Sequence, residues 1–373
     1  MDIYFALIGM VLILPVACCG IRNLEKRKNA ILIISILCLF LLTALKAPSV
    51  GKDIAGYKRV YDSMKYQTWD NYDTTWMEWG YEFLMMAFTH IFKASFQTFM
   101  VCVYGFVYYS YYRFIKRYSQ DYTTSVILYI CFTFLTFDMS AVRTVIGVAI
   151  CLYAIPYAEK PGIKNFLKFF LIVIIAAQIH KSAYIFVAAY FIIKIHFSVK
   201  SSVFYIGGSM ALLLLKSQFY GFINTYLKSV QESRTSLGGN LLIYIMSVVL
   251  TIYVWIYYKK THKSYSEMTE DDSRSSAMAT DFSDSGLAMR MIYVGIVLQL
   301  FGAGTVLTRM AQYFQVFILI LIPNNIMRLD QKSRMMVRMI LYSLAIVYFI
   351  KFTLIPDPLD IVCLLYTSDA ADD

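Results

Sequence analysis

Charged residues are scarce in this sequence. Only 16% of its 373 residues are Asp, Glu, Lys or Arg, whereas 59% are hydrophobic and 17% are aromatic. A soluble protein carries about 25% charged residues, so this deficit argues against an ordinary soluble fold. Apolar stretches that could cross about 30 Å of hydrocarbon recur along the chain. The sequence therefore predicts an all-α integral membrane protein.

Motifs for metals, nucleotides and disulfides are missing as well. The seven cysteines are scattered and show neither a CxxC pair nor a Cys/His metal spacing. We find no P-loop, dinucleotide-binding fingerprint, HExxH motif or repeat of fixed period. The net charge of +10 lies mostly in short loops, so it does not indicate a nucleic-acid-binding face. We expect no cofactor and no nucleic acid, and leave a divalent cation open.

The apolar segments predict a polytopic helical bundle of about 12 transmembrane helices in a single membrane domain, residues 1–361. Lys and Arg cluster in alternate loops, beginning with residues 22–28, and the positive-inside rule places these loops in the cytoplasm. The N-terminus is then outside. The predicted spans are 3–19, 30–45, 96–113, 122–137, 141–158, 164–180, 182–195, 201–216, 240–258, 287–304, 310–327 and 336–354.

One apolar segment, residues 80–94, is left out of this count. A full crossing there would move every later basic loop to the outside, against the positive-inside rule. We therefore predict a re-entrant or interfacial helix that packs within the protein. Two polar insertions remain: an aromatic outer loop, 46–79, and a Ser- and Asp-rich cytoplasmic loop, 261–285, that we expect to be disordered.

The last residues, 362–373, differ in character from the rest of the chain. Back-translation of Leu-Leu-Tyr-Thr-Ser-Asp-Ala-Ala-Asp-Asp gives a sequence that resembles a transposase-type sequencing adapter. We expect this segment to be adapter read-through and not native protein, with C-terminal spans missing from the chain.

Three basic residues stand beside long apolar runs on the predicted outer face: Arg143, His180 and Arg309. A charge at membrane depth costs about 2.5–3.5 kcal/mol on insertion scales, so such groups usually face a cavity or a partner. Together they predict a site for an anionic ligand. For Arg143 we favour a bidentate contact with a phosphate or pyrophosphate, and the alternative is snorkelling or an ion pair with Asp138.

The other two basic residues allow similar alternatives. His180 ends an outward-running helix and could be a general base, a neutral hydrogen-bonding group or an ordinary interface residue. Arg309 and Tyr313 are four residues apart and share a helical face. We predict that they contact a ligand, and the alternative is a helix-end anchor beside an interfacial tyrosine.

Asp53 and Glu82 flank the outer loop and are the candidate carboxylates. Either could act as a base toward an acceptor hydroxyl, or hold a divalent cation with a pyrophosphate. Solvated loop carboxylates are the simpler alternative.

Four short stretches resemble the EpsG-type family of bacterial polysaccharide polymerases, related in role to the Wzy O-antigen polymerases. The likeness covers about residues 1–355, with Lys46 where an Arg is common and Thr144 where a Gln often follows the Arg. The stretches are Val50–Asp53 with Tyr57 and Tyr61, Glu78–Leu84, Ser140–Gly147 with His180–Ser182, and Arg309–Phe314.

The resemblance implies a multi-pass enzyme of the bacterial plasma membrane that joins undecaprenyl-pyrophosphate-linked oligosaccharide repeats at the outer face, for exopolysaccharide, capsule or O-antigen. Its partners would be membrane lipid, a flippase and a chain-length regulator. Implied ligand contacts are Lys46, Tyr57, Arg143, Arg309 and Tyr313. Implied proton acceptors are His180, Asp53 and Glu82.

Two other functions remain as alternatives. A lipid-phosphate-dependent monosaccharide glycosyltransferase would share the anion site and the acidic outer loop. A lipid-linked oligosaccharide flippase would show midplane charges and repeated halves, which the sequence does not display.

Overall fold

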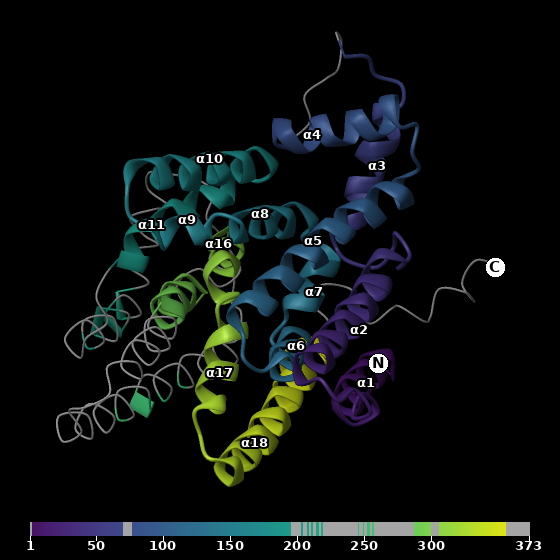
Figure 1. Ribbon diagram of the computed structural model, residues 1–373. Helices are drawn as coiled ribbons and strands as arrows, with labels where there is room; N and C mark the ends of the chain where they lie inside the picture. Colours follow the sequence, from purple (N-terminus) through teal and green to yellow (C-terminus); the bar gives the residue numbers. More distant parts are fainter. Residues whose placement is uncertain are drawn as a thin grey trace. The chain divides into compact units, whose positions relative to one another are not determined.

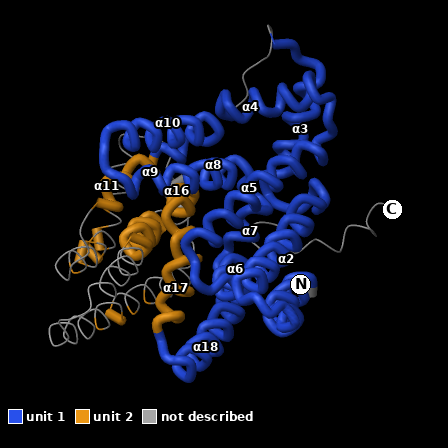
Figure 2. The backbone as a smooth tube through the Cα atoms, in the orientation of Figure 1, with its two compact units in different colours: residues 1–184, 329–373 blue, residues 185–328 orange. Residues whose placement is uncertain are grey.

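The structure, a computed structural model, describes residues 2–69, 77–194, 287–299 and 306–355, with isolated positions between 203 and 256. All regular elements of this part of the chain are helical, which confirms the predicted all-α class (Figure 1). The chain forms two compact units (Figure 2). Unit 1 comprises residues 1–184 and 329–373, and unit 2 comprises residues 185–328.

Unit 1 holds most of the described helices. Its helices are α1 (Asp2–Ala17), α2 (Leu24–Ala44), α3 (Ile54–Met64), α4 (Trp79–Met86), α5 (Phe96–Tyr118), α6 (Tyr122–Cys131), α7 (Phe134–Ser140), α8 (Val142–Leu152), α9 (Ile155–Ala158), α10 (Ile163–Ile179) and α18 (Gln331–Phe349). A π-helical turn, Ala87–Ile91, continues α4, and another, Ile350–Leu354, continues α18. The described helices of unit 2 are α11 (Val187–Lys194), residues 287–299, α16 (Val306–Gln315) and α17 (Ile318–Met327).

Four of the helices in unit 1 begin at a residue whose side chain satisfies a free backbone N–H group. Each side-chain oxygen accepts a hydrogen bond from the N–H three residues later, which offsets the unpaired donors of the first turn. The capping residues are Asn23 for α2, Ser95 for α5, Asp121 for α6 and Asp330 for α18.

Three helices among the described residues are long and apolar enough to cross a membrane: Leu24–Ala44, Arg309–Met327 and Gln331–Leu354. A fourth crossing results if α6 and α7, which are bent by 54°, form one span. These helices indicate a multi-pass membrane protein. The predicted count of about 12 spans is not confirmed.

Several predicted spans are interrupted. The span predicted at 122–137 breaks at Thr133, which has a left-handed φ of 69°, and the span at 141–158 breaks between α8 and α9. The span at 182–195 begins with a 3-10 helix, Lys181–Phe186. The predicted spans 201–216 and 240–258 fall mostly outside the described residues, and segments 261–285 and 362–373 lie wholly outside them.

Helix α10 exposes a continuous apolar face. Ile163, Leu167, Leu171 and Ile175 follow one another at intervals of four residues, and each is at least half exposed. Residues four apart lie on the same side of a helix, so these side chains form one stripe. A row of exposed large aliphatic side chains is typical of a surface that faces lipid, and the opposite side of α10 packs in unit 1.

The predicted re-entrant segment, 80–94, is a short helix in the structure. Together α4 and the following π-helical turn cover residues 79–91. At 1.5 Å per residue this is about 20 Å, which is shorter than the hydrocarbon core of a membrane. The described part of the outer loop, up to Trp69 and from Met77, lies next to this helix along the chain, whereas residues 70–76 are outside the described residues.

Helix α4 meets the end of α10 at Gly80 (Figure 1). A Cβ atom at Gly80 would lie 2.7 Å from the carbonyl oxygen of Gln178 and 2.8 Å from its Cβ. Real Cβ contacts essentially never come this close, so the close approach of the two backbones requires glycine. This approach brings the residues just before α4 to the residues just after α10.

We expect the substitution Gly80→Ala to separate these two helices. Overpacking of this kind costs about 1–3 kcal/mol, so the thermal unfolding midpoint of the purified protein should fall. Gly56→Ala, within α3, is the matched control because nothing lies within 4 Å of its Cβ position. The control should be neutral or should stabilise by up to about 1 kcal/mol. Equal midpoints for both variants would show that α4 and α10 do not need this contact.

Candidate functional site

The carboxylate of Glu78 joins two of the predicted basic residues. Its Oε2 atom accepts a hydrogen bond from Nη1 of Arg143 at 2.5 Å. Its Oε1 atom lies 2.9 Å from Nδ1 of His180 and accepts a hydrogen bond from the backbone N–H of Lys181 at 3.1 Å. The three side chains are only 5–11% exposed, so the cluster is nearly shielded from solvent.

All three residues stand at helix ends. Glu78 immediately precedes α4 in an extended conformation and does not cap that helix with its side chain. Arg143 is the second residue of α8, just after the break at Ala141. His180 follows α10 with a φ of −156° and a ψ of 119°, and this extended turn presents its ring and the next N–H to Glu78. The breaks between helices therefore position the site.

Glu78 is ionised throughout the physiological pH range. Burial raises the pKa of its carboxyl group, but the hydrogen bonds from His180 and Lys181 and the charge of Arg143 together lower this pKa to about 2. The cluster thus holds a buried ion pair between a guanidinium and a carboxylate. An ionised carboxylate only accepts hydrogen bonds, so Nδ1 of His180 is the donor to Glu78.

This hydrogen bond determines the state of the other ring nitrogen. When His180 is neutral with its proton on Nδ1, Nε2 carries the basic lone pair. Nε2 is buried and has no hydrogen-bond partner among the described residues. A carboxylate therefore orients the His180 ring, and the unpaired Nε2 atom of that ring is suited to accepting a proton.

The guanidinium of Arg143 contacts the side chain of Tyr57. Its Nε atom donates to the hydroxyl of Tyr57 at 3.4 Å, and the guanidinium carbon lies 5.6 Å from the centroid of the Tyr57 ring. The Tyr81 ring packs edge-on against Tyr57, with centroids 5.8 Å apart. Tyr57 therefore restricts where the guanidinium can move.

Two more buried polar atoms have no hydrogen-bond partner in the described part of the chain. They are the hydroxyl of Tyr81 and Oγ1 of Thr144, whose residues are 0% and 1% exposed. An unsatisfied buried polar atom costs about 1–3 kcal/mol. Nε2 of His180 is a third such atom. Thr144 follows Arg143 in the sequence, Tyr81 packs on Tyr57, and His180 shares the Glu78 carboxylate with Arg143. These three unpaired atoms favour a polar ligand as their partner.

Lys46, predicted as a ligand contact, forms hydrogen bonds to the protein backbone. Its Nζ atom donates to the carbonyl oxygens of Val50, at 3.0 Å, and Met139. Burial lowers the pKa of Lys46 to about 7, although the charge of Asp138 opposes this shift. Gly51, with a φ of 98°, lets the same loop reach the Met139 carbonyl. Lys46 therefore ties the loop before α3 to the end of α7.

The remaining predicted site residues are Asp53, Glu82, Arg309 and Tyr313. Asp53 precedes α3 and is half-buried, and Glu82 is buried in the first turn of α4, one turn beyond Glu78. Arg309 and Tyr313 lie on α16 in unit 2, where Tyr313 is buried with its ring 6.4 Å from that of Phe186. These placements leave the predicted roles as proposals.

Glu78, which joins Arg143 and His180, is the member of the cluster that sequence reasoning did not select. It lies in one of the four resembling stretches, but Asp53 and Glu82 were the chosen carboxylates. The alternative partner proposed for Arg143, Asp138, instead accepts a hydrogen bond from the Tyr129 hydroxyl. No local signal selects Glu78, because Gly80, where a helix could approach another backbone, is two residues from both Glu78 and Glu82.

Metal ligands are not grouped in the described residues. None of these residues form a set of three or more His, Cys, Asp or Glu side chains that could hold a metal ion. In the Glu78 cluster, the carboxylate already neutralises Arg143, and a divalent cation there would approach a buried guanidinium.

We expect Glu78→Gln to destabilise the protein, because Arg143 then keeps a buried charge without its carboxylate. Breaking a buried ion pair on one side costs about 3–5 kcal/mol. The matched control is Asp62→Asn, which removes an exposed carboxylate from Lys58 and Lys65 and should cost no more than about 1 kcal/mol. Thermal unfolding in detergent measures both, and similar losses in the two variants would contradict a buried pair.

The stabilisation by Glu78 should persist in mild acid. Its folded-state pKa of about 2 lies below the ordinary value of 4.5, so the stabilisation is complete above 4.5 and is lost as the pH falls toward 2. The difference in unfolding midpoint between the wild type and Glu78→Gln should therefore be similar at about pH 7 and about pH 5, and smaller at about pH 3. A difference that disappears already between pH 7 and pH 5 would contradict the low pKa.

Comparison with known proteins supports the resemblance. The model of the EpsG family matches residues 29–368, which include every residue of the site and the first part of segment 362–373. No curated protein and no solved structure matches the chain. Because the match covers nearly the whole sequence, the chain belongs to the EpsG family, whose members are polysaccharide polymerase-type membrane proteins.

Proposed function

We propose that this EpsG-family member joins lipid-linked oligosaccharide repeat units at the outer face of the bacterial plasma membrane. The growing saccharide would leave undecaprenyl pyrophosphate and pass to a sugar hydroxyl of an incoming lipid-linked unit. The observation that carries the proposal is the Glu78 carboxylate, which orients His180 and neutralises Arg143 in one buried cluster.

The proposed reaction needs a base and a group that stabilises the departing pyrophosphate. The bond between the donor sugar carbon and the pyrophosphate oxygen breaks, and a bond to the acceptor oxygen forms. The acceptor proton moves to Nε2 of His180, and the carboxylate of Glu78 stabilises the resulting imidazolium. The pyrophosphate leaves with the bonding electron pair, and Arg143 offsets its added negative charge.

Neighbouring residues would bind the saccharides. Tyr57 holds the guanidinium in place, and the unpaired hydroxyls of Tyr81 and Thr144 would hydrogen-bond to sugar hydroxyls. We propose Arg309 and Tyr313 as contacts of the lipid-linked substrate. Asp53 and Glu82 remain alternative proton acceptors, although the hydrogen bond to Glu78 favours His180. A flippase and a chain-length regulator would be its protein partners.

We predict that His180→Gln and Arg143→Lys block chain growth. Loss of a general base lowers rates by about 10²–10⁴-fold, and Lys cannot reproduce the planar fork of Arg. The variants, a deletion and the Asp62→Asn control are compared in the source strain with the full-length gene. Lipid-linked and surface saccharides are then extracted and sized, with membrane levels of each variant checked by immunoblot.

Single repeats on lipid should accumulate and long chains should vanish in the deletion and both site variants, while Asp62→Asn keeps normal chains. Normal chain length in the deletion would rule out a polymerase. Loss of even the single-repeat lipid would indicate a transferase that adds one monosaccharide earlier. Normal chains in His180→Gln at wild-type protein levels would remove His180 as the base.

A further inference from the structure

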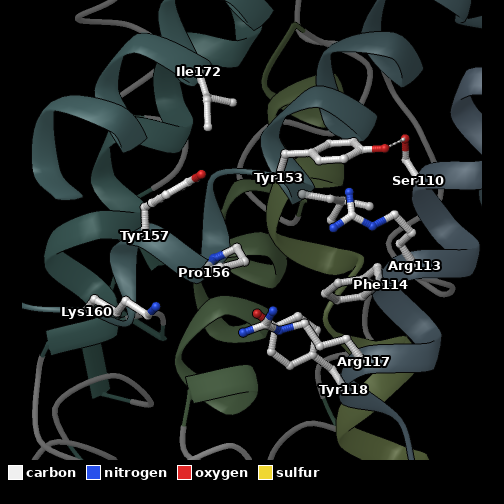
Figure 3. A pocket seen from close by; sticks show the side chains of 11 residues that line it. Ser110, Arg113, Phe114, Arg117, Tyr118, Tyr153, Pro156, Tyr157, Lys160 and Ile172 are labelled. Atoms are coloured by element: carbon white, nitrogen blue, oxygen red, sulfur yellow. Dashed lines mark hydrogen bonds between the residues drawn. The ribbon is translucent and has the colours of Figure 1, made fainter.

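A second cavity lies within unit 1, away from the Glu78 cluster. It has a volume of about 450 Å³ and is bounded by the last turns of α5, the end of α8, α9, Lys160 and, from the middle of α10, Ile172 (Figure 3). The Glu78 cluster lies at the start of α8 and just after the end of α10. Ile172, the residue of α10 that lines the cavity, precedes His180 by eight residues, which is about 12 Å along the helix.

Three basic side chains line this cavity: Arg113, Arg117 and Lys160. Arg117 pairs with Glu159 at 3.7 Å, so one carboxylate partly offsets three cations and an excess of two positive charges remains. Arg113 and Lys160 form no hydrogen bond or ion pair to the part of the chain that the structure describes. All three are exposed, and cations that gather without matching carboxylates favour an anionic ligand.

One of these cations, Arg113, packs on an aromatic ring beside the cavity. The guanidinium of Arg113 lies 4.8 Å from the centroid of the Tyr153 ring, and Figure 3 shows the two side by side. Tyr153 also accepts a hydrogen bond from the hydroxyl of Ser110 at 3.4 Å and stacks on Phe106 with an interplanar angle of 9°. Arg113 is exposed, and this ring contact restricts where its guanidinium lies.

Apolar surface continues from the cavity. Ile172 of α10 lines it, and the neighbouring Leu167, Leu171 and Ile175 belong to the exposed apolar stripe of that helix. Phe106, stacked on Tyr153, is 39% exposed. A ligand bound at the cations would therefore lie beside an apolar surface. Such a surface suits the acyl chain of a lipid better than a soluble anion.

The basic residues also lie at or just beyond helix ends that the positive-inside rule assigns to the cytoplasmic side. Anionic lipids of that leaflet attract basic residues near the membrane surface, and basic pockets between helices bind lipid head groups there. We propose that this cavity, the Arg113–Lys160 pocket, binds the phosphate head group of an anionic membrane lipid. The inference does not depend on the proposed polymerase activity.

The test compares lipid binding by the full chain and its variants. Arg113→Gln with Lys160→Gln removes the two pocket cations that have no carboxylate partner, and Lys26→Gln with Lys332→Gln removes two other exposed cations on the same predicted face. Each protein is purified into nanodiscs of phosphatidylcholine, alone or mixed with phosphatidylglycerol. Native mass spectrometry counts retained lipids, and thermal unfolding is measured with each lipid mixture and with added inorganic phosphate.

We expect wild type and the Lys26/Lys332 control to retain phosphatidylglycerol and to unfold at higher temperature in its presence. The pocket variant should bind phosphatidylglycerol about 30-fold more weakly, because each basic residue near an anionic surface contributes about fivefold. An equal loss in the control would overturn the pocket in favour of general surface charge. Stabilisation of wild type by inorganic phosphate without lipid retention would overturn the lipid assignment in favour of a soluble phosphate.

Discussion

The arrangement of unit 1 around the site depends on neutralising one buried guanidinium. Arg143 lies at the start of an apolar helix and is almost completely shielded from solvent. Burying its charge without a carboxylate partner would be strongly unfavourable. Glu78, 65 residues earlier, supplies that carboxylate only if α4 lies against the end of α10. The same contact brings His180, 102 residues after Glu78, to the other carboxylate oxygen. One carboxylate thus ties together three distant segments, each at a helix end.

Much of the helical structure could be predicted, and the exceptions have physical causes. Long apolar helices such as α2 and α18 follow from composition, and their starts carry capping residues such as Asn23 and Asp330. The breaks were harder to predict. Thr133 adopts a left-handed conformation that its side chain does not favour, so only tertiary packing explains the bend between α6 and α7. The break before α9 did have a local signal, Pro156 in its first turn.

The site was predicted in part for a similar reason. A charge beside an apolar run is conspicuous, so Arg143 and His180 could be selected from the sequence alone. Asp53, Glu78 and Glu82 all flank the same polar loop, and nothing local distinguishes them. The fold makes the choice, because only Glu78 stands where α4 crosses the end of α10. The resemblance implies that Lys46 contacts the ligand, whereas in the structure its hydrogen bonds go to backbone carbonyls.

Glu78 has two partners with different demands, and this has a consequence for the proposed reaction. In the structure, its charge is divided between the guanidinium of Arg143 and the imidazole of His180. A pyrophosphate bound at Arg143 would supply its own negative charge to the guanidinium. More of the carboxylate charge would then act on His180 and stabilise the imidazolium that forms as the acceptor loses its proton. In the proposed mechanism, donor binding and proton acceptance are therefore coupled through a single carboxylate, and a lipid-linked donor would prepare the base that its own transfer requires.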